Sequence, residues 1–181
     1  MGAITEFDFK LLDAISELRC EALTVIMKVF SYLGSGGIIW IVTGLILTAI
    51  PKTRKIGIFS LVALAVEYTV GDLMIKPLIA RERPFIQHPW IDTIIKQPGS
   101  YSFPSGHTSS SAAVSFMIFL HNKKAGIPMM IIAVLIMFSR LYFCVHFPTD
   151  ILFGVIHGVL WTVIVYILLN KIIEKKKLTS Q

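Results

Sequence analysis

Residues 151–169 read ILFGVIHGVLWTVIVYILL, a stretch that contains no Asp, Glu, Lys or Arg. Residues 125–144 read AGIPMMIIAVLIMFSRLYFC, in which Arg140 is the only charged residue. A helix needs about 20 mostly apolar residues to cross a bilayer, because every backbone amide must be bonded within the span. These two stretches predict transmembrane helices, and therefore an all-α membrane protein.

Three more apolar stretches lie upstream, at residues 56–79, 108–120 and 22–50. Stretch 22–50 is interrupted by Lys28 and by the run Gly34-Ser35-Gly36-Gly37, and we count it as one crossing. Stretch 108–120 is short and begins with small residues, which suit close packing among other helices. The sequence thus predicts a polytopic transmembrane helix bundle of about five or six spans, forming a single domain over residues 1–181.

The N-terminal region carries a helical pattern of a different kind. Phe7, Leu11, Ile15 and Leu18 recur at spacings of three and four, whereas Asp8 and the other charged residues fall largely elsewhere. Such spacing is typical of an amphipathic helix. We expect this helix to lie along the membrane surface.

Composition narrows the class of protein. The chain is 55% hydrophobic and only 15% charged, which is too apolar for a soluble domain. Its net charge of +6 comes from short basic groups between apolar stretches, so we expect no nucleic-acid partner. Cys20 and Cys144 have no CxxC spacing and predict neither a metal site nor a redox motif.

Three basic groups set the expected topology. With five crossings all of them lie on one side, which the positive-inside rule assigns to the cytoplasm. The loop 80–103 and the Phe147-Pro148 turn then lie on the opposite face. We therefore expect a multi-pass cell-membrane protein whose active site is extracytoplasmic. The three groups are Lys52, Arg54 and Lys55; Lys123 and Lys124; and Lys171, Lys175, Lys176 and Lys177.

Polar residues gather at the helix ends of this outer face. Lys76, Arg83 and Arg140 are cations without a matching set of carboxylates, so together they favour an anion, above all a phosphate. Ser105 and Gly106 directly precede an apolar helix, whose first amides and positive dipole end would point at the same anion. The pattern predicts a phosphate-binding site.

Two histidines supply the chemistry. His146 and Asp150 are four residues apart around Pro148, which can bring the carboxylate to the imidazole and orient it. This pair fits a nucleophile and its orienting acid. His107 comes from another helix and is free to protonate the leaving group. Together these residues predict phosphoryl transfer.

The same residues form three spaced motifs: Lys-x6-Arg-Pro at 76–84, Pro-Ser-Gly-His at 104–107, and Ser-Arg-x5-His-x3-Asp at 139–150. In this order the chain resembles the type 2 phosphatidic acid phosphatase (PAP2) superfamily. The resemblance implies that His146 forms a phosphohistidine, that Asp150 activates it and that His107 is the general acid. It also implies a reaction without a metal cofactor. The phosphate-binding residues that it implies are Lys76, Arg83, Ser105, Gly106 and Arg140.

Other polar residues have plainer interpretations. Lys76 is placed to pair with Asp72 at i, i+4, and we expect the lysine to turn to phosphate when substrate binds. Glu67 has no partner evident on another helix, so a helix-packing hydrogen bond is expected for it. Two further groups are expected to be nonessential or simply solvated, with head-group recognition as the alternative for the second. These are His88, His121 and His157, and the loop residues Arg81, Glu82, Trp90 and Lys96.

Several functions remain open at this point. The leading hypothesis is a lipid phosphatase with a lipid phosphate substrate among membrane lipids, and family analogy favours conversion of undecaprenyl diphosphate to undecaprenyl phosphate. Phosphatidylglycerophosphate and phosphatidate are alternative substrates. A membrane transporter using Glu67 and Asp72 is the non-phosphatase alternative, and a vanadate-dependent haloperoxidase is a third. The sequence leaves the oligomeric state unknown.

Overall fold

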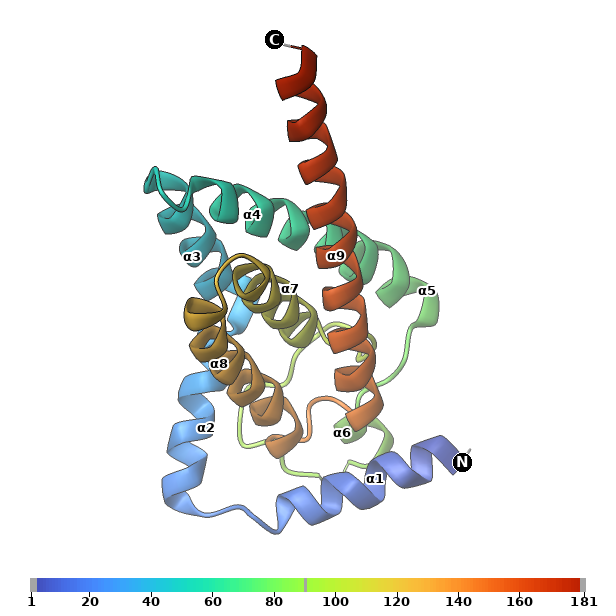
Figure 1. Ribbon diagram of the computed structural model, residues 1–181. Coiled ribbons are helices and arrows are strands. Elements are labelled where there is room, and N and C mark those ends of the chain that lie inside the picture. Colours follow the sequence, from blue (N-terminus) through green and yellow to red (C-terminus); the bar gives the residue numbers. More distant parts are fainter. Residues whose placement is uncertain (1–2, 90, 180–181) are drawn as a thin grey trace.

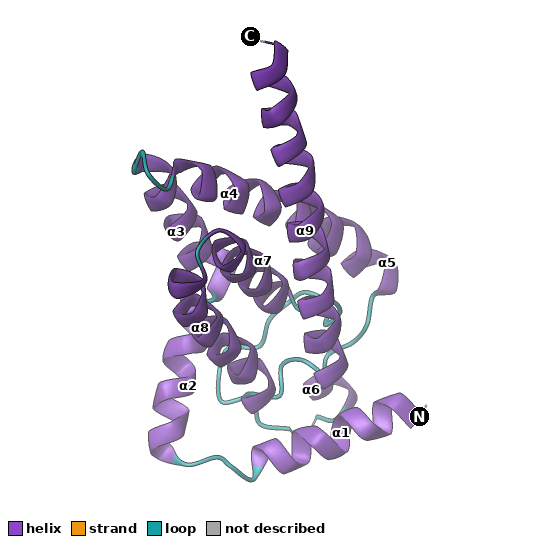
Figure 2. Ribbon diagram, in the orientation of Figure 1, coloured by secondary structure: helices purple, strands orange, loops and turns teal. Residues whose placement is uncertain are grey.

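The computed structural model describes residues 3–89 and 91–179, and every regular element within them is a helix (Figure 2). The prediction of an all-α fold is confirmed. Figure 1 shows the elements, which in chain order are α1 (Ala3–Ser16), α2 (Glu21–Leu33), η1 (Ser35–Gly37), α3 (Ile38–Ala49), α4 (Arg54–Tyr68), η2 (Thr69–Ile75), α5 (Lys76–Ile79), α6 (Pro84–Gln87), α7 (Gly106–His121), α8 (Lys123–Tyr142) and α9 (Pro148–Thr179).

Three helical stretches of the described chain are long and apolar enough to cross a membrane. They are the run from Arg54 to Gln87, helix α8 and helix α9. Helix α2 and the η1–α3 segment reach that standard only together, as a pair bent by 47°. Helix α7 has 16 residues and is shorter than a full span. The count of five or six spans therefore stays a prediction.

The predicted first crossing is two helices joined at a glycine turn. Gly36 and Gly37 have φ values of 60° and 66°, a left-handed conformation that favours glycine. At Gly34 an added Cβ would lie 2.6 Å from Ile136 of α8, so the chain can pass there only without a side chain. Beyond the turn, Trp40 is fully buried and donates from Nε1 to Ser111 Oγ of α7 at 2.9 Å.

Helix α7 forms the centre of the bundle. It packs against α4, α8 and α9, and its residues 108–115 are buried. The carbonyl of Ala113 accepts from Thr162 Oγ1 of α9 at 3.0 Å, and Gly158 of α9 leaves room for the carbonyl of Ser109. Small side chains thus let the helices approach closely, as the sequence predicted for this stretch.

Helix α1 forms over most of the predicted stretch and ends at Ser16. Phe9 and Leu12 are buried beside Phe147 and Cys144 of the turn before α9, whereas Phe7 of the predicted apolar face is 61% exposed. Asp8, which the pattern placed away from that apolar face, is fully buried. The exposed apolar residues leave the membrane-surface placement of α1 a prediction.

The two ends of the bundle carry different elements. The α3–α4 turn and the C-terminal end of α9 lie at the upper end of Figure 1, and α1 lies at the lower end. Lys55 donates to Asn170 Oδ1 at 2.6 Å, which ties the α3–α4 turn to α9. Helix α9 continues ten residues beyond the predicted Leu169, through a lysine-rich stretch of good helix formers. Which end faces the cytoplasm stays a prediction.

Candidate active site

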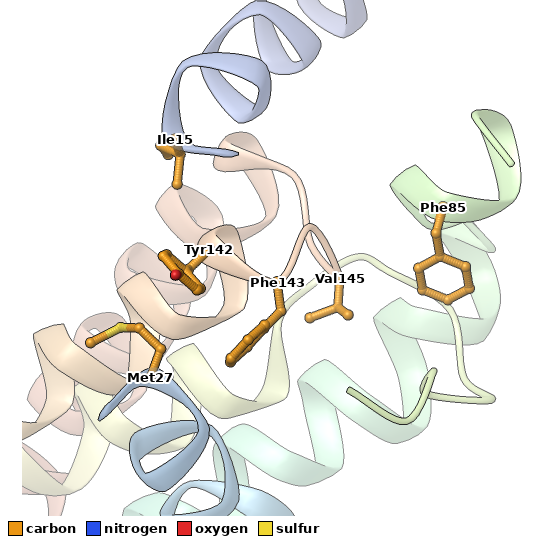
Figure 3. Close-up of a cluster of buried hydrophobic side chains, with 6 residues drawn as sticks. All are labelled: Ile15, Met27, Phe85, Tyr142, Phe143 and Val145. Atoms are coloured by element: carbon orange, nitrogen blue, oxygen red, sulfur yellow. The ribbon is translucent and has the colours of Figure 1, made fainter. Parts of the chain in front are cut away.

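The turn between α8 and α9 carries His146 and is held by apolar contacts on several sides. Figure 3 shows Phe143 and Val145 of the turn lying between Met27 of α2 and Phe85 of α6. Phe143 and Val145 are fully buried, and so is Phe147, which packs with the α1 side chains. Because their side chains have no room to move without opening a cavity, the backbone around His146 is fixed.

Asp150 lies in the first turn of α9 and faces His146. Its Oδ2 is 3.5 Å from His146 Nδ1, longer than an ordinary hydrogen bond. The same oxygen accepts from Ser102 Oγ at 2.5 Å and from the backbone N–H of Phe147 at 2.9 Å. The bond to the amide just before the helix resembles the returning half of a capping box. The carboxylate is therefore oriented before any ligand arrives.

Arg83 fixes the tautomer of His146. Its Nη1 lies 3.1 Å from His146 Nε2, and a guanidinium can only donate. Nε2 is therefore the acceptor and the proton resides on Nδ1, the nitrogen that faces Asp150. Burial, followed by the charge of Arg83, lowers the pKa of His146 to about 3. The imidazole is thus neutral near pH 7, with its lone pair on Nε2, as a nucleophile requires.

Arg83 is itself heavily bonded to the loop before α7. Its guanidinium donates to Ser100 O at 2.7 Å, to Tyr101 O at 3.1 Å and to Val145 O at 2.6 Å. It also donates to Ser100 Oγ at 3.2 Å. A phosphate at this position would have to replace some of these partners, so Arg83 holds the loop and the His146 turn together in this state.

The N-terminus of α7 lies beside an ion pair formed by Asp72 of η2 and Lys76 of α5. Lys76 is buried and forms an ion pair with Asp72, which confirms the predicted i, i+4 contact. An added Cβ on Gly106 would lie 2.9 Å from Asp72 Oδ2, so glycine is needed for this approach. The Asp72 carboxylate therefore lies at the positive end of α7, where a helix N-terminus favours an anion. The π-helical segment that carries Asp72 is of a kind often found at functional sites.

Two side chains on the same cavity wall, Arg140 and His107, each have one buried guanidinium or ring nitrogen without a hydrogen bond to the described residues. Arg140, in the last turn of α8, donates to Ser31 Oγ of α2, but its Nε makes no hydrogen bond with the described residues. His107 Nε2 is also buried without a hydrogen-bond partner among them. Leaving such groups unpaired is costly, and an anion would satisfy them.

These groups share one cavity of about 570 Å³. Six of the eight predicted site residues line it, whereas Ser105 and Asp150 lie behind the wall and are fully buried. The Ser105 hydroxyl accepts from Thr108 Oγ1 at 3.0 Å. Residues of α3 and α4 form a largely apolar part of the wall, with Glu67 of α4 beside it. The predicted residues on the wall are Lys76, Arg83, Gly106, His107, Arg140 and His146; Ile41, Leu61, Leu64 and Ala65 line the apolar end.

The sequence did not point to several polar contacts. Arg81 was expected to be solvated, and this was wrong: its guanidinium contacts Asp150 Oδ1 at 2.6 Å and Asp8 Oδ2 at 2.7 Å. A helix-packing hydrogen bond was expected for Glu67; its Oε2 lies 4.0 Å from His157 Nδ1 of α9 and makes no hydrogen bond with the described residues. The residues of these pairs are far apart in sequence, and no periodic pattern links them. Trp90, considered as an interfacial anchor, lies outside the described residues.

Metal ligands were not expected. Within residues 3–89 and 91–179, no three His, Cys, Asp or Glu side chains are grouped in a way that could hold a metal ion. Both cysteines are free thiols. A metal-independent reaction stays a prediction, which the experiment below tests with a chelator.

Comparison with known proteins gives the family. Residues 56–174, which contain all three motifs, match the PAP2 superfamily. The chain belongs to the PAP2 superfamily. The solved PAP2 type phosphatidylglycerolphosphate phosphatase from Bacillus subtilis is 26% identical, with a TM-score of 0.78 over 95% of this chain and 89% of its own. The fold and the three motifs therefore agree with a PAP2 membrane protein.

Two curated relatives are also similar to this PAP2 chain. The bacitracin transport permease protein BcrC of Bacillus licheniformis is 32% identical over 120 residues, which cover 66% of this chain and 59% of the relative. The undecaprenyl-diphosphatase BcrC of Bacillus subtilis is 33% identical over 96 residues, which cover 53% of this chain and 47% of the relative. The matches thus span about half the length of these relatives.

Proposed function

We propose that this PAP2 chain is a membrane lipid phosphatase that removes phosphate from a lipid head group. The observation that carries the proposal is the two-ended cavity. One end presents Lys76, His107, Arg140 and His146, and the other is apolar and lies between two helices of the bundle. A substrate with an anionic head group and an apolar tail matches both ends.

The reaction follows from the tautomer of His146. Its Nε2 lone pair attacks phosphorus, and the P–O bond to the leaving group breaks as the P–N bond forms. The Nδ1–H, facing Asp150, allows the ring to carry positive charge. In its protonated form His107 gives a proton to the leaving oxygen. The neutral His107 then takes a proton from the water that attacks phosphorus, and the P–N bond breaks, which frees His146 and inorganic phosphate. Lys76 and Arg140 stabilise the charge on the phosphoryl oxygens.

Undecaprenyl diphosphate is the substrate that we favour, giving undecaprenyl phosphate and inorganic phosphate. The name of the Bacillus subtilis curated relative supports this choice. Phosphatidylglycerophosphate is the alternative suggested by the solved relative, and phosphatidate is a third candidate. We further propose that the site faces the extracytoplasmic side, on the basis of the basic groups at the opposite end of the bundle.

Transport is the second candidate, because the Bacillus licheniformis relative is named a transport permease protein. Glu67, Asp72 and His157 would then be the pathway residues, since all three lie in or beside the membrane-length run and α9. This function predicts flux of bacitracin that survives loss of His146. The phosphatase proposal predicts that any resistance or flux effect disappears with His146.

The experiment that tests the proposal is phosphate release by purified protein in detergent. Undecaprenyl diphosphate, phosphatidylglycerophosphate and phosphatidate are supplied in turn with EDTA present, to wild type and to His146→Ala. We expect release that persists in EDTA, ranks undecaprenyl diphosphate first and is lost in the variant. Equal release by both proteins, or none from any lipid by folded wild type, would overturn the phosphatase assignment.

A further inference from the structure

A buried ion network lies behind Asp150, on the side away from the cavity. Arg81 divides its guanidinium between two carboxylates: Nη1 contacts Asp150 Oδ1 at 2.6 Å and Nη2 contacts Asp8 Oδ2 at 2.7 Å. Both carboxylates are fully buried, and the Arg81 side chain is 19% exposed. Neither Arg81 nor Asp8 lines the cavity.

Other bonds close the network around Arg81. Its Nη1 also donates to Thr149 Oγ1 at 2.8 Å, and its guanidinium lies 4.0 Å from the ring centroid of Phe147. Its own carbonyl accepts from the N–H of Ser102, the residue whose hydroxyl donates to Asp150. Arg81 therefore restrains Asp150 twice, directly through Oδ1 and indirectly through Ser102 on Oδ2.

Asp8 of helix α1 binds the second terminal nitrogen, Nη2, of Arg81. Asp8 accepts from the backbone N–H of Thr149 at 3.1 Å and from its hydroxyl at 2.6 Å, next to Asp150 in the chain. Replacing one partner of a buried ion pair is strongly destabilising, because the other charge is left unpaired. Asp8 thus fixes both Arg81 and the first turn of α9.

The charge balance of this network matters to His146. Asp8, Arg81 and Asp150 together carry one net negative charge, whereas Arg81 and Asp150 alone would carry none. Because Asp8 shares the guanidinium, Asp150 keeps negative charge to offer the imidazole when Nε2 attacks and the ring becomes positive. A network without Asp8 would neutralise the carboxylate that the reaction needs.

We propose that Arg81 is a positioning residue that sets the geometry and charge of Asp150, and that Asp8 couples helix α1 to the same carboxylate. The inference rests on the proposed function, because its kinetic consequence is a change in turnover. In metal sites, outer-shell partners that orient a histidine contribute about 10- to 100-fold, and we take that range as the scale for Arg81. We therefore expect Arg81→Met to lower kcat roughly 10- to 100-fold, with KM changed by less than about twofold, since Arg81 is not on the cavity wall.

Two milder variants and a matched control sharpen the test. Arg81→Lys keeps the positive charge but not the two-pronged guanidinium, so we expect its kcat to lie between those of Arg81→Met and wild type. Asp8→Asn keeps an acceptor for Thr149 and releases half of Arg81, so kcat should fall by about threefold to tenfold. Arg19→Met is the control: Arg19, in the linker after α1, bonds to the end of α8 through Tyr142 O at 2.9 Å and to Cys144 Sγ at 3.2 Å, without touching Asp150.

Each protein is assayed for phosphate release from the lipid that wild type hydrolyses best, and its melting temperature is measured. The same samples, labelled with ¹⁵N-histidine, give the Nδ1–H resonance of His146, assigned by its loss in His146→Gln. We expect Arg81→Met to lower kcat and move this resonance, and Arg19→Met to lower the melting temperature while leaving both unchanged.

Three results would contradict either the positioning role of Arg81 or the proposed function. Unchanged kcat and an unmoved resonance in Arg81→Met would overturn the positioning role, and so would a raised KM with unchanged kcat, which would assign Arg81 to head-group binding. If wild type released no phosphate from any lipid but the resonance still moved, the coupling of Arg81 to His146 would hold and the proposed function would fail.

Discussion

The two ends of the cavity are built from different parts of the helices. At the polar end, His107 comes from the first turn of α7, Arg140 from the last turn of α8, and His146 from the turn before α9. At the apolar end, Leu61 and Leu64 come from the body of α4. Helix ends offer unpaired amides and tolerate charge, whereas the middle of a membrane helix does not. We therefore expect the head group and the tail of the proposed lipid substrate to be recognised by separable regions, and substitutions should separate the two.

The largest effect is expected at the polar end, from Arg140→Met. Arg140 lines the cavity and its buried Nε has no hydrogen-bond partner among the described residues, so its substitution removes a cationic donor from the wall. Removing one preorganised donor of this kind costs about 100- to 1,000-fold in rate. We expect kcat/KM to fall by that factor for a long-tailed lipid and for a short-chain analogue alike. A loss confined to the long-tailed lipid would contradict the division of the cavity.

Gly106→Ala tests the backbone of the same end. Its Cβ would lie 2.9 Å from Asp72 Oδ2 and push the carboxylate, with its Lys76 partner, out of place. Displacing a site by about 1 Å can cost roughly 100-fold, so we expect a fall of about 10- to 100-fold in kcat/KM. Gly99→Ala is the matched control, because a Cβ there meets no atom within 4 Å. Equal activity of the two variants would remove Gly106 from the site.

A smaller and more selective effect is expected at the apolar end. Leu64→Trp fills the groove between α3 and α4, and should raise KM for the long-tailed lipid by about tenfold, the scale on which apolar pockets discriminate. The short-chain analogue should be hydrolysed as by wild type. Ile58→Trp is the control, because the Ile58 side chain lies on the same helix and is 43% exposed. Loss of both substrates in Leu64→Trp would show that the two ends are not independent.

The last effect concerns the stability of the fold against pH and is measured on a scale separate from the kinetic effects. The folded protein holds the pKa of His146 at about 3, below its ordinary 6.5. Between these two pH values the imidazole is protonated only in the unfolded chain. The free energy of unfolding should therefore fall as pH drops through that window, by up to about 1.4 kcal/mol per pH unit. His146→Gln cannot take up the proton and should lose less stability between pH 6.5 and pH 4. Parallel melting curves for the two proteins would contradict this.

The sequence predicted the parts of the site that rest on local spacing. His146 with Asp150, and Asp72 with Lys76, are each four residues apart, which on a helix or at its start brings two side chains together. Apolar length likewise predicted the helices, because backbone bonding in lipid leaves few alternatives. The mid-chain motifs could be placed at one end of the bundle because each adjoins a helix terminus.

The rest depends on contacts between distant segments, which periodicity does not encode. Asp8 and Arg81 meet only because α1 docks against the start of α9, and the burial of Asp8 on α1 could not be predicted for the same reason. The glycine run was visible as a break, but its spacing predicted neither the 47° bend nor the approach of Gly34 to Ile136 of α8. The cavity itself exists only between helices that the sequence does not place side by side.

The central claim is that His146 forms a bond to phosphorus, and its direct test is to trap that bond. Wild type is mixed with lipid labelled in the terminal phosphate, quenched in alkali within one turnover and digested. We expect label that survives alkali, is lost in acid, as a phosphohistidine requires, maps to residues 141–150, and is missing from His146→Ala. Phosphate release by wild type with no labelled protein, or label on another residue, would contradict the account.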